Sequence, residues 1–230
     1  MLSVRNMTAG YGNKPVLTGV SLDVFSGEIV ALFGHNGVGK TTFLNALFGL
    51  VRLSAGVVSV RGRSLVPTPL RMIRNQMGYI PQGSRVFSEL TVSENLDVAC
   101  AGGAGQAQQE EAVASVLELF PHLKGRLKQR AGTLSGGERQ MLAMSSCLVT
   151  NPGILLLDEP SLGLAPSVIS RIFSLLRELR SKGKTILIVE QRVREVLQLA
   201  DRFYLLHQGS ITYSGATADV READLGTIFL

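Results

Sequence analysis

The chain has 230 residues, of which 45% are hydrophobic and 18% charged, a composition typical of a globular domain or two small lobes and not of a disordered chain. The formal net charge of +5 is a modest excess, and no block of five like charges appears, so charge gives no case for nucleic acid as a partner. Cys100 and Cys147 are too far apart for a metal motif and are expected to be buried free thiols.

Strand patterns dominate the beginning of the chain. Apolar and polar residues alternate over residues 20–24, as in a half-buried antiparallel strand, and residues 28–33 form a short apolar run typical of a buried strand. A glycine-rich loop follows, and residues 41–50 are predicted to be a helix. Residues 57–60 are another short β-branched run. The N-terminus lacks a signal-peptide pattern, and no run of 18 uninterrupted apolar residues predicts a membrane span.

The middle of the chain changes to helical spacing. Gly102, Gly103 and Gly105 predict a break, after which apolar residues at 113, 116, 117 and 120 predict an amphipathic helix that stops at Pro121. Apolar residues at 141, 144 and 148 repeat this spacing before Asn151. We therefore expect a helical segment over about residues 86–150, inserted into a strand-rich pattern.

The last part predicts a parallel sheet. Residues 154–157 form a continuous apolar strand, residues 168–179 a helix, and residues 185–189 another apolar strand. Strand, helix and strand make a βαβ unit, whose strands are parallel.

Residues 34–41 (GHNGVGKT) match the phosphate-binding pattern G-x-x-x-x-G-K-[ST] in full, directly after a predicted strand and at the start of a predicted helix. The glycines allow backbone N–H groups to approach phosphate oxygens closely, and the helix N-terminus adds a partial positive charge. Lys40 adds a full charge at the β- and γ-phosphates, and Thr41 offers a hydroxyl ligand to Mg²⁺. This motif alone leaves kinases, GTPases, helicases and transport ATPases open.

Two acidic residues end the predicted strand at residues 154–157. Ligands bind at the carboxyl ends of strands in open α/β sheets. Asp158 is therefore a candidate to hold Mg²⁺ through water, and Glu159 a candidate general base that polarises the attacking water.

Residues 134–140 (LSGGERQ) place two glycines behind Ser135 at the start of a helix, which is a second candidate anion site at a helix N-terminus. One nucleotide does not need two such sites, so two chains are expected to sandwich the nucleotide. Ser135 and Glu138 also fit an ordinary capping box, and both roles are compatible.

Together these motifs resemble the ATP-binding cassette (ABC) family over nearly the whole chain, because five family elements occur in order: Tyr11, residues 34–41, Gln82, residues 134–138 and residues 154–159. The resemblance implies that Tyr11 stacks on adenine, that Gln82 contacts Mg²⁺ and the γ-phosphate, and that the signature serine and second glycine bind the γ-phosphate on a partner subunit. The implied nucleotide-binding set is Tyr11, Gly34, His35, Asn36, Gly37, Val38, Gly39, Lys40, Thr41, Thr42, Ser135, Gly136 and Gly137. The implied metal set is Thr41, Gln82 and Asp158, and the implied catalytic set is Glu159, Gln82 and Gln191.

Two positions depart from the family pattern. Glu190 and Gln191 stand where most members carry a switch histidine after the strand at residues 185–189, and residues 161–164 lack the usual aspartate. These departures look like one subgroup. Residues 85–96, 118–123, 160–166 and 189–191 together resemble the second ATPase of branched-chain amino acid importers, and importers of urea and short amides look much the same.

The expected fold is an α/β P-loop NTPase: a RecA-like core of about residues 1–85 and 151–230, with an N-terminal antiparallel β portion and an inserted helical subdomain of about residues 86–150. The resemblance implies hydrolysis of ATP, with Mg²⁺, coupled to uptake of branched-chain amino acids or a related small solute. The implied partners are a second ABC ATPase subunit, permease subunits and, through them, a solute-binding protein, at the cytoplasmic face of the inner membrane. The rival is a soluble ABC ATPase acting on ribosomes or DNA, which usually carries two cassettes or a long coiled coil.

Overall fold

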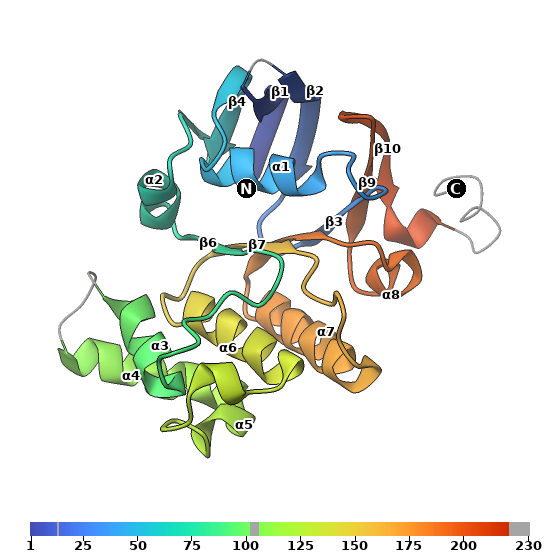
Figure 1. Ribbon diagram of the computed structural model, residues 1–230. Helices are drawn as coiled ribbons and strands as arrows, with labels where there is room; N and C mark the ends of the chain where they lie inside the picture. The colour runs from blue at the N-terminus through green and yellow to red at the C-terminus, as the bar shows by residue number, and fades with distance from the viewer. Residues whose placement is uncertain (13, 102–105, 221–230) are drawn as a thin grey trace.

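A computed structural model describes residues 1–12, 14–101 and 106–220. Within these residues a four-stranded antiparallel sheet has the order β2-β1-β4-β5 (Figure 1). Its strands are β1 (Leu2–Tyr11), β2 (Lys14–Val24), β4 (Leu53–Val60) and β5 (Arg63–Leu65). The alternating residues 20–24 lie in β2, and the run at 57–60 lies in β4, so the predicted N-terminal antiparallel portion is confirmed.

A second sheet forms the centre of the fold and, among the described residues, has six strands in the order β10-β9-β3-β8-β7-β6. Its strands are β3 (Ile29–Phe33), β6 (Met77–Ile80), β7 (Ile154–Asp158), β8 (Thr185–Val189), β9 (Arg202–His207) and β10 (Ser210–Ala216). Every pair is parallel except β9 with β10, an antiparallel edge hairpin that the sequence analysis did not predict.

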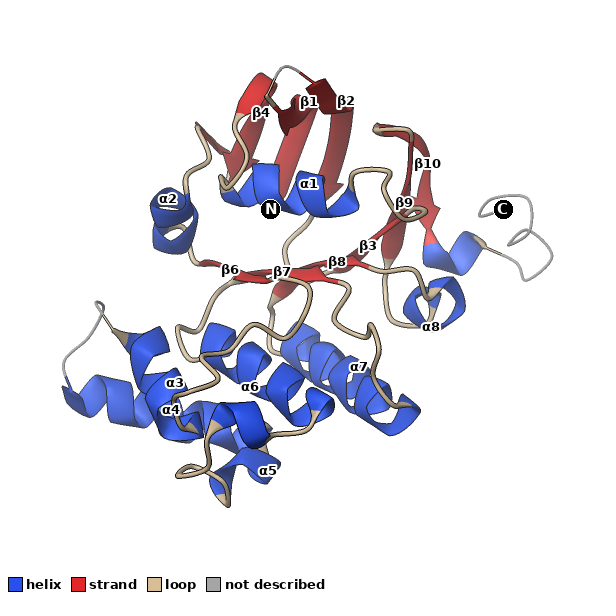
Figure 2. Ribbon diagram, in the orientation of Figure 1, coloured by secondary structure: helices blue, strands red, loops and turns tan. Residues whose placement is uncertain are grey.

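Helices cover both faces of the second sheet (Figure 2). α1 lies between the two sheets, where it contacts β1, β2 and β7, and α3 to α7 lie on the opposite face. The described helices are α1 (Lys40–Phe48), α2 (Pro69–Arg74), α3 (Val92–Cys100), α4 (Gln106–Leu119), α5 (Pro121–Lys124), α6 (Gly136–Leu148), α7 (Pro166–Ser181) and α8 (Val193–Leu197), with 3-10 turns at Ala131–Thr133 and Thr217–Asp219. None of these helices has both the length and the apolar character needed to cross a bilayer.

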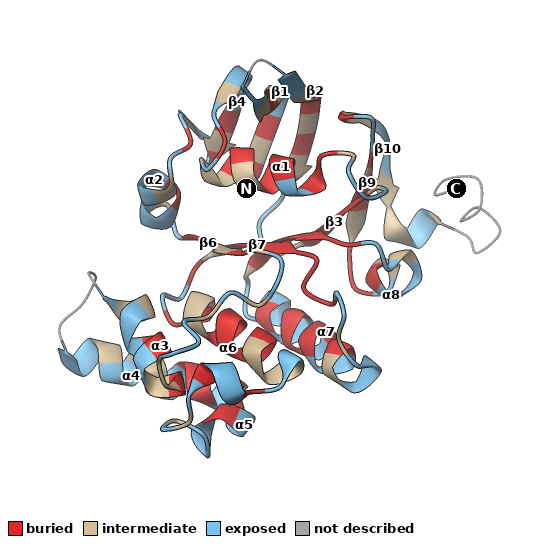
Figure 3. Ribbon diagram, in the orientation of Figure 1, coloured by how far each residue is buried: buried red, intermediate tan, exposed pale blue. Residues whose placement is uncertain are grey.

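The central strands are buried on both faces, so alternate residues belong to two different cores (Figure 3). Along β3, Ile29, Ala31 and Phe33 pack with the helices α3 to α7, whereas Val30 and Leu32 pack with α1 and the antiparallel sheet. This explains why the predicted strands contain continuous apolar runs, since neither face meets water.

Three expectations need comment. The predicted amphipathic helix stops before Pro121, as expected, because α4 ends at Leu119; Pro121 is then the first residue of the short helix α5, a position where proline needs no backbone N–H. The break expected at Gly102, Gly103 and Gly105 lies outside the described residues. Both cysteines are free, as expected, but each is only partly buried.

Candidate functional site

The phosphate loop connects β3 to α1 and depends on glycine at two close approaches. A Cβ atom at Gly34 would lie 2.5 Å from the Leu206 carbonyl oxygen, and a Cβ atom at Gly39 would lie 2.8 Å from Leu17 Cδ2. Gly39 also has a left-handed backbone, with φ of 107°. The loop can therefore keep this shape only with glycine at both positions, and α1 begins directly after it at Lys40.

Lys40 is almost fully buried inside this loop. Its Nζ donates to the carbonyl oxygens of Gly34 at 2.9 Å and His35 at 3.1 Å. The same ammonium group lies 3.3 Å from Glu159 Oε1, and both side chains of this ion pair are buried. The phosphate loop thus encloses a full positive charge, which is held by two carbonyl oxygens and by the Glu159 carboxylate.

Thr41 and Asp158 bring the loop and the end of β7 together. Thr41 Oγ1 donates to Asp158 Oδ1 at 3.2 Å. Tyr79, at the end of β6, places its hydroxyl 3.3 Å from Asp158 Oδ2 and 3.0 Å from Asn45 Oδ1. Burial raises the pKa of Asp158, and burial together with the Asp158 charge raises the pKa of Tyr79 well above its usual value.

Glu159 is the point where three candidate residues meet. It follows β7 in a left-handed conformation, with φ of 46°, and its own N–H donates to the Val189 carbonyl at 2.9 Å. Its carboxylate accepts from Gln82 Nε2 at 3.1 Å and from Gln191 Nε2 at 2.7 Å, besides pairing with Lys40. The structure thus brings Gln82, Gln191 and Lys40 together at the Glu159 carboxylate.

Glu190 connects the segment after β8 to the segment after β7. The side chain is 2% exposed, and its carboxylate accepts the N–H of Ser161 at 2.9 Å and the N–H of Gln191 at 3.2 Å. Burial raises the pKa of Glu190. This carboxylate fixes the backbone that carries Gln191, and through Ser161 it fixes the residues that follow Glu159.

The signature segment forms the predicted capping box. Ser135 Oγ accepts the Glu138 N–H at 3.3 Å, and a Glu138 carboxylate oxygen accepts the Ser135 N–H at 2.8 Å. A Cβ atom at Gly137 would lie 2.8 Å from Val168 Cγ2, whereas one at Gly136 would meet no atom within 4 Å. Among the described residues, no hydrogen bond or ion pair joins this segment to the phosphate loop, and α6 and α1 lie on opposite faces of the central sheet (Figure 1).

The remaining predicted residues surround this centre. Tyr11 ends β1 and is 56% exposed, so its ring is free to meet a ligand, and Thr42 is buried in α1. A cavity of about 480 Å³ opens beside the loop. It is lined by Phe33, Gly34, His35, Asn36, Glu190, Gln191, Val193 and Leu205. Its volume falls within the usual range for small-molecule sites.

Sequence reasoning missed Asn45 and Tyr79 as parts of the site, and it noted Glu190 only as a departure from the family pattern. Asn45 and Tyr79 are distant in the chain, and their contact depends on α1 lying over the end of β6. The available signal was a polar aromatic residue three positions before Gln82 at the end of an apolar strand.

A glycine loop around a buried lysine, facing paired carboxylates at a strand end, defines a P-loop nucleoside triphosphatase. The chain belongs to the ABC transporter family, whose model matches residues 17–162. As a member of this family it is an ATP-binding ATPase, and the predicted fold class is confirmed.

Three curated relatives illustrate the range of this family. The chain is 45% identical, over 98% of its length and 100% of the relative's, to the high-affinity branched-chain amino acid transport ATP-binding protein BraG of Pseudomonas aeruginosa. It is 39% identical, over 96% of its length and 94% of the relative's, to the probable branched-chain amino acid transport ATP-binding protein LivF of Archaeoglobus fulgidus. It is also 36% identical, over 96% and 92% of the two lengths, to the lipopolysaccharide export system ATP-binding protein LptB of Haemophilus influenzae.

Solved structures agree with the fold. An ATP-binding subunit of an ABC transporter is 32% identical and matches with a TM-score of 0.85, over 97% of this chain and 92% of that one. The ADP conformation of another ABC transporter cassette is 27% identical and also matches with a TM-score of 0.85, over 99% and 98% of the two chains.

Proposed function

We propose that the chain hydrolyses Mg-ATP at the site between the phosphate loop and β7. The contact between Thr41 Oγ1 and Asp158 Oδ1, at 3.2 Å, supports a magnesium site, because both atoms are oxygen ligands of the kind that Mg²⁺ prefers. Thr41 and Asp158 would hold the ion. Gln82 lies close to this site, where its side chain donates a hydrogen bond to Glu159. An Mg²⁺ ion held by these residues would supply positive charge to offset the negative charge of the phosphates.

In this mechanism Glu159 is the general base. Its carboxylate is placed by Gln82 and Gln191, and it accepts a proton from the water that attacks the γ-phosphate. Lys40 must leave Glu159 to bind the phosphates, so nucleotide binding itself frees the base. Gln191 carries a neutral amide, which can orient groups by hydrogen bonding but cannot shuttle a proton at neutral pH. Tyr11 is proposed to stack on adenine.

The signature helix is proposed to complete the nucleotide site of a second ABC ATPase subunit. The observation that supports this is the position of α6 and α1 on opposite faces of the central sheet, which keeps Ser135 and the phosphate loop of one chain apart (Figure 1). The exposed N-terminus of α6, with Ser135, Gly136 and Gly137, is then free to bind a γ-phosphate presented by another chain.

We further propose that the chain serves an importer of branched-chain amino acids, peripheral to the cytoplasmic face of the inner membrane. The names of the relatives BraG and LivF support this solute. The inserted helical subdomain, about residues 86–150, and the neighbouring α2 would dock permease subunits. Exposed apolar side chains occur on these segments, at Leu70, Ile73, Phe87 and Val98. A solute-binding protein would act through the permeases.

The test is uptake of labelled leucine by cells that lack this chain and carry it back on a plasmid. Wild type should restore uptake, and Lys40→Ala should not, although its abundance in the cell is unchanged. Restored urea or acetamide uptake without leucine uptake would move the chain to the alternative importers. Restored efflux of labelled solute, with no uptake, would contradict import. Export is a relevant alternative because the relative LptB is named as part of an export system.

A further inference from the structure

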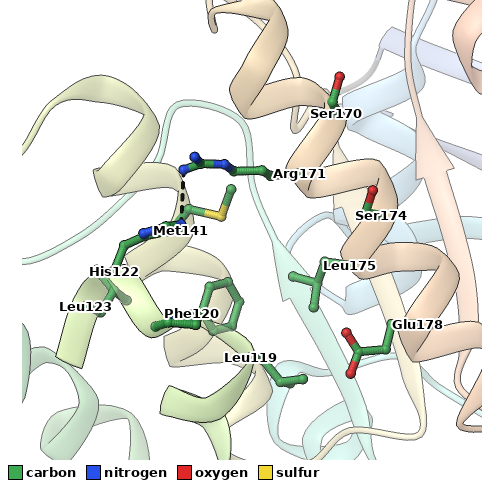
Figure 4. A pocket seen from close by; sticks show the side chains of 11 residues that line it. Leu119, Phe120, His122, Leu123, Met141, Ser170, Arg171, Ser174, Leu175 and Glu178 are labelled. Carbon is green, nitrogen blue, oxygen red and sulfur yellow. Dashed lines mark hydrogen bonds between the residues drawn. The ribbon is translucent and has the colours of Figure 1, made fainter.

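A second cavity, of about 340 Å³, lies on the face of the central sheet away from α1, between the end of α4, α5, α6 and α7 (Figure 4). Its floor is apolar, and the residues of this floor are Leu119, Phe120, Leu123, Met141 and Leu175. None of these residues belongs to the proposed nucleotide site. The volume is at the lower end of the range for small-molecule sites, which fits a ligand of a few carbon atoms.

The two ends of this cavity differ in charge. At one end Arg171 of α7 and His122 of α5 point toward each other, with Arg171 Nη1 3.0 Å from His122 Nε2 (Figure 4). No ion pair joins Arg171 to a carboxylate in the described part of the chain, and Glu138, which lines the adjoining cavity with Arg171, is already paired with Arg126 at 3.1 Å. At the other end Glu178 is already paired with Lys182 at 2.7 Å. The cavity therefore offers one cationic end and an apolar floor.

We propose that this cavity binds a small monocarboxylate with an apolar body. The planar guanidinium of Arg171 presents parallel donors that match a carboxylate, and such charge-assisted pairs are the strong hydrogen bonds of proteins. The apolar floor buries an alkyl group, which adds affinity in proportion to the area removed from water. An amine would meet the Arg171 charge instead, and Glu178 is occupied by Lys182.

A carboxylate bound to Arg171 would lie next to another cavity, which reaches the signature segment. Arg171, His122, Leu123 and Met141 also line a neighbouring cavity of about 320 Å³, which reaches Ser135 and Gly137. The ligand would share Arg171 with His122, and so connect α7 of the core to α5 and to the N-terminal part of α6. The binding proposal itself does not depend on which solute the transporter carries.

The test is an NMR titration of the purified full chain with 4-methylpentanoate, which has one carboxylate and a branched alkyl body. Saturable binding with a dissociation constant on the order of 1 mM is expected for a ligand of this size. Arg171→Gln keeps a polar side chain beside His122 but removes the charge, and it should weaken binding about tenfold or more. Arg177→Gln is the matched control, because it removes the same charge from an exposed position on the same helix.

A second variant tests the floor of the cavity. Leu119→Glu adds a carboxylate at its edge and should weaken binding at least as much as Arg171→Gln does, while unchanged ATP affinity shows that each variant is folded. Acetate, which lacks the apolar body, and 3-methylbutylamine, which lacks the carboxylate, should bind much more weakly. Two results would overturn the proposal. One is equal binding of 4-methylpentanoate to wild type and to Arg171→Gln; the other is no saturable binding at ligand concentrations up to about ten times the expected dissociation constant.

One further comparison identifies the source of the ligand. Leucine has the carbon skeleton of 4-methylpentanoate with an added ammonium group. If leucine binds as tightly as 4-methylpentanoate and its binding depends on Arg171, the natural ligand is a transported amino acid. If leucine binds more weakly, the natural ligand is a carboxylic acid without the ammonium group. Because this titration needs no transport, its failure is distinguishable from failure of the importer assignment.

Discussion

Replacing Glu159 by glutamine should separate ATP binding from ATP hydrolysis. The Glu159 carboxylate makes a buried ion pair with Lys40 at 3.3 Å and accepts from Gln191 at 2.7 Å. Glutamine has nearly the same shape but no charge and no basic oxygen. It therefore removes the proposed general base and also removes the competitor that holds Lys40 away from phosphate.

The size of each effect follows from the structure. At 3.3 Å and an effective dielectric constant of about 20, the Lys40–Glu159 attraction is about 5 kcal/mol before desolvation. Desolvation of two buried charges offsets most of this attraction, leaving about 1–2 kcal/mol as the net cost of withdrawing Lys40 from Glu159. Glu159→Gln should then tighten Mg-ATP binding about tenfold. Loss of a general base should slow hydrolysis by roughly 10²–10⁴.

The assay measures both quantities on one preparation: calorimetric titration with Mg-ATP, and steady-state ATPase activity in the assembled transporter. Glu111→Gln is the control, because it removes the same charge from an exposed position on α4. Hydrolysis by Glu159→Gln within threefold of wild type would refute the assignment of the base. Weaker rather than tighter binding would refute the competition between Glu159 and phosphate for Lys40.

Three further outcomes are expected. Lys40→Ala should weaken Mg-ATP binding about 100-fold or more, because it removes the buried cation of the loop, and near-normal affinity in a titration would mean that the site is misplaced. Gln191→Ala should slow ATPase turnover about tenfold at most, since it removes one neutral hydrogen bond; a rate as low as that of Glu159→Gln would show a larger role. Gly137→Ala should lower the free energy of unfolding by about 1–3 kcal/mol, because its Cβ meets Val168 at 2.8 Å, whereas Gly136→Ala should not; thermal unfolding of both variants decides this.

The parts of the site that sequence predicts are those in which one short motif fixes both chemistry and local structure. Residues 34–41 specify a strand, a glycine loop and a helix together, so Lys40 falls where the pattern puts it. The carboxylates at the end of β7 are predictable for the same reason, because a continuous apolar strand that ends in acids points to one edge of a parallel sheet.

The remaining features depend on contacts between distant segments. The Glu190 carboxylate reaches the Ser161 N–H only because β7 and β8 are neighbours in the sheet, and nothing local to Glu190 indicates this. Likewise, Gly137 was predicted only as a phosphate contact, but it is also required where α6 packs against Val168. The β9–β10 hairpin was missed because its burial does not alternate clearly along the strands.

The central claim is that the signature helix of this chain completes a nucleotide site on another chain. Gly136→Asp tests it most directly, because a side chain fits there without meeting any atom within 4 Å, and its carboxylate would face the incoming γ-phosphate. Gly125→Asp, at another open glycine of the helical region, is the matched control. ATP hydrolysis by the assembled transporter should fall about tenfold or more with Gly136→Asp, through repulsion of like charges, while the isolated variant binds ATP as wild type does. Hydrolysis at the rate of Gly125→Asp would contradict the account.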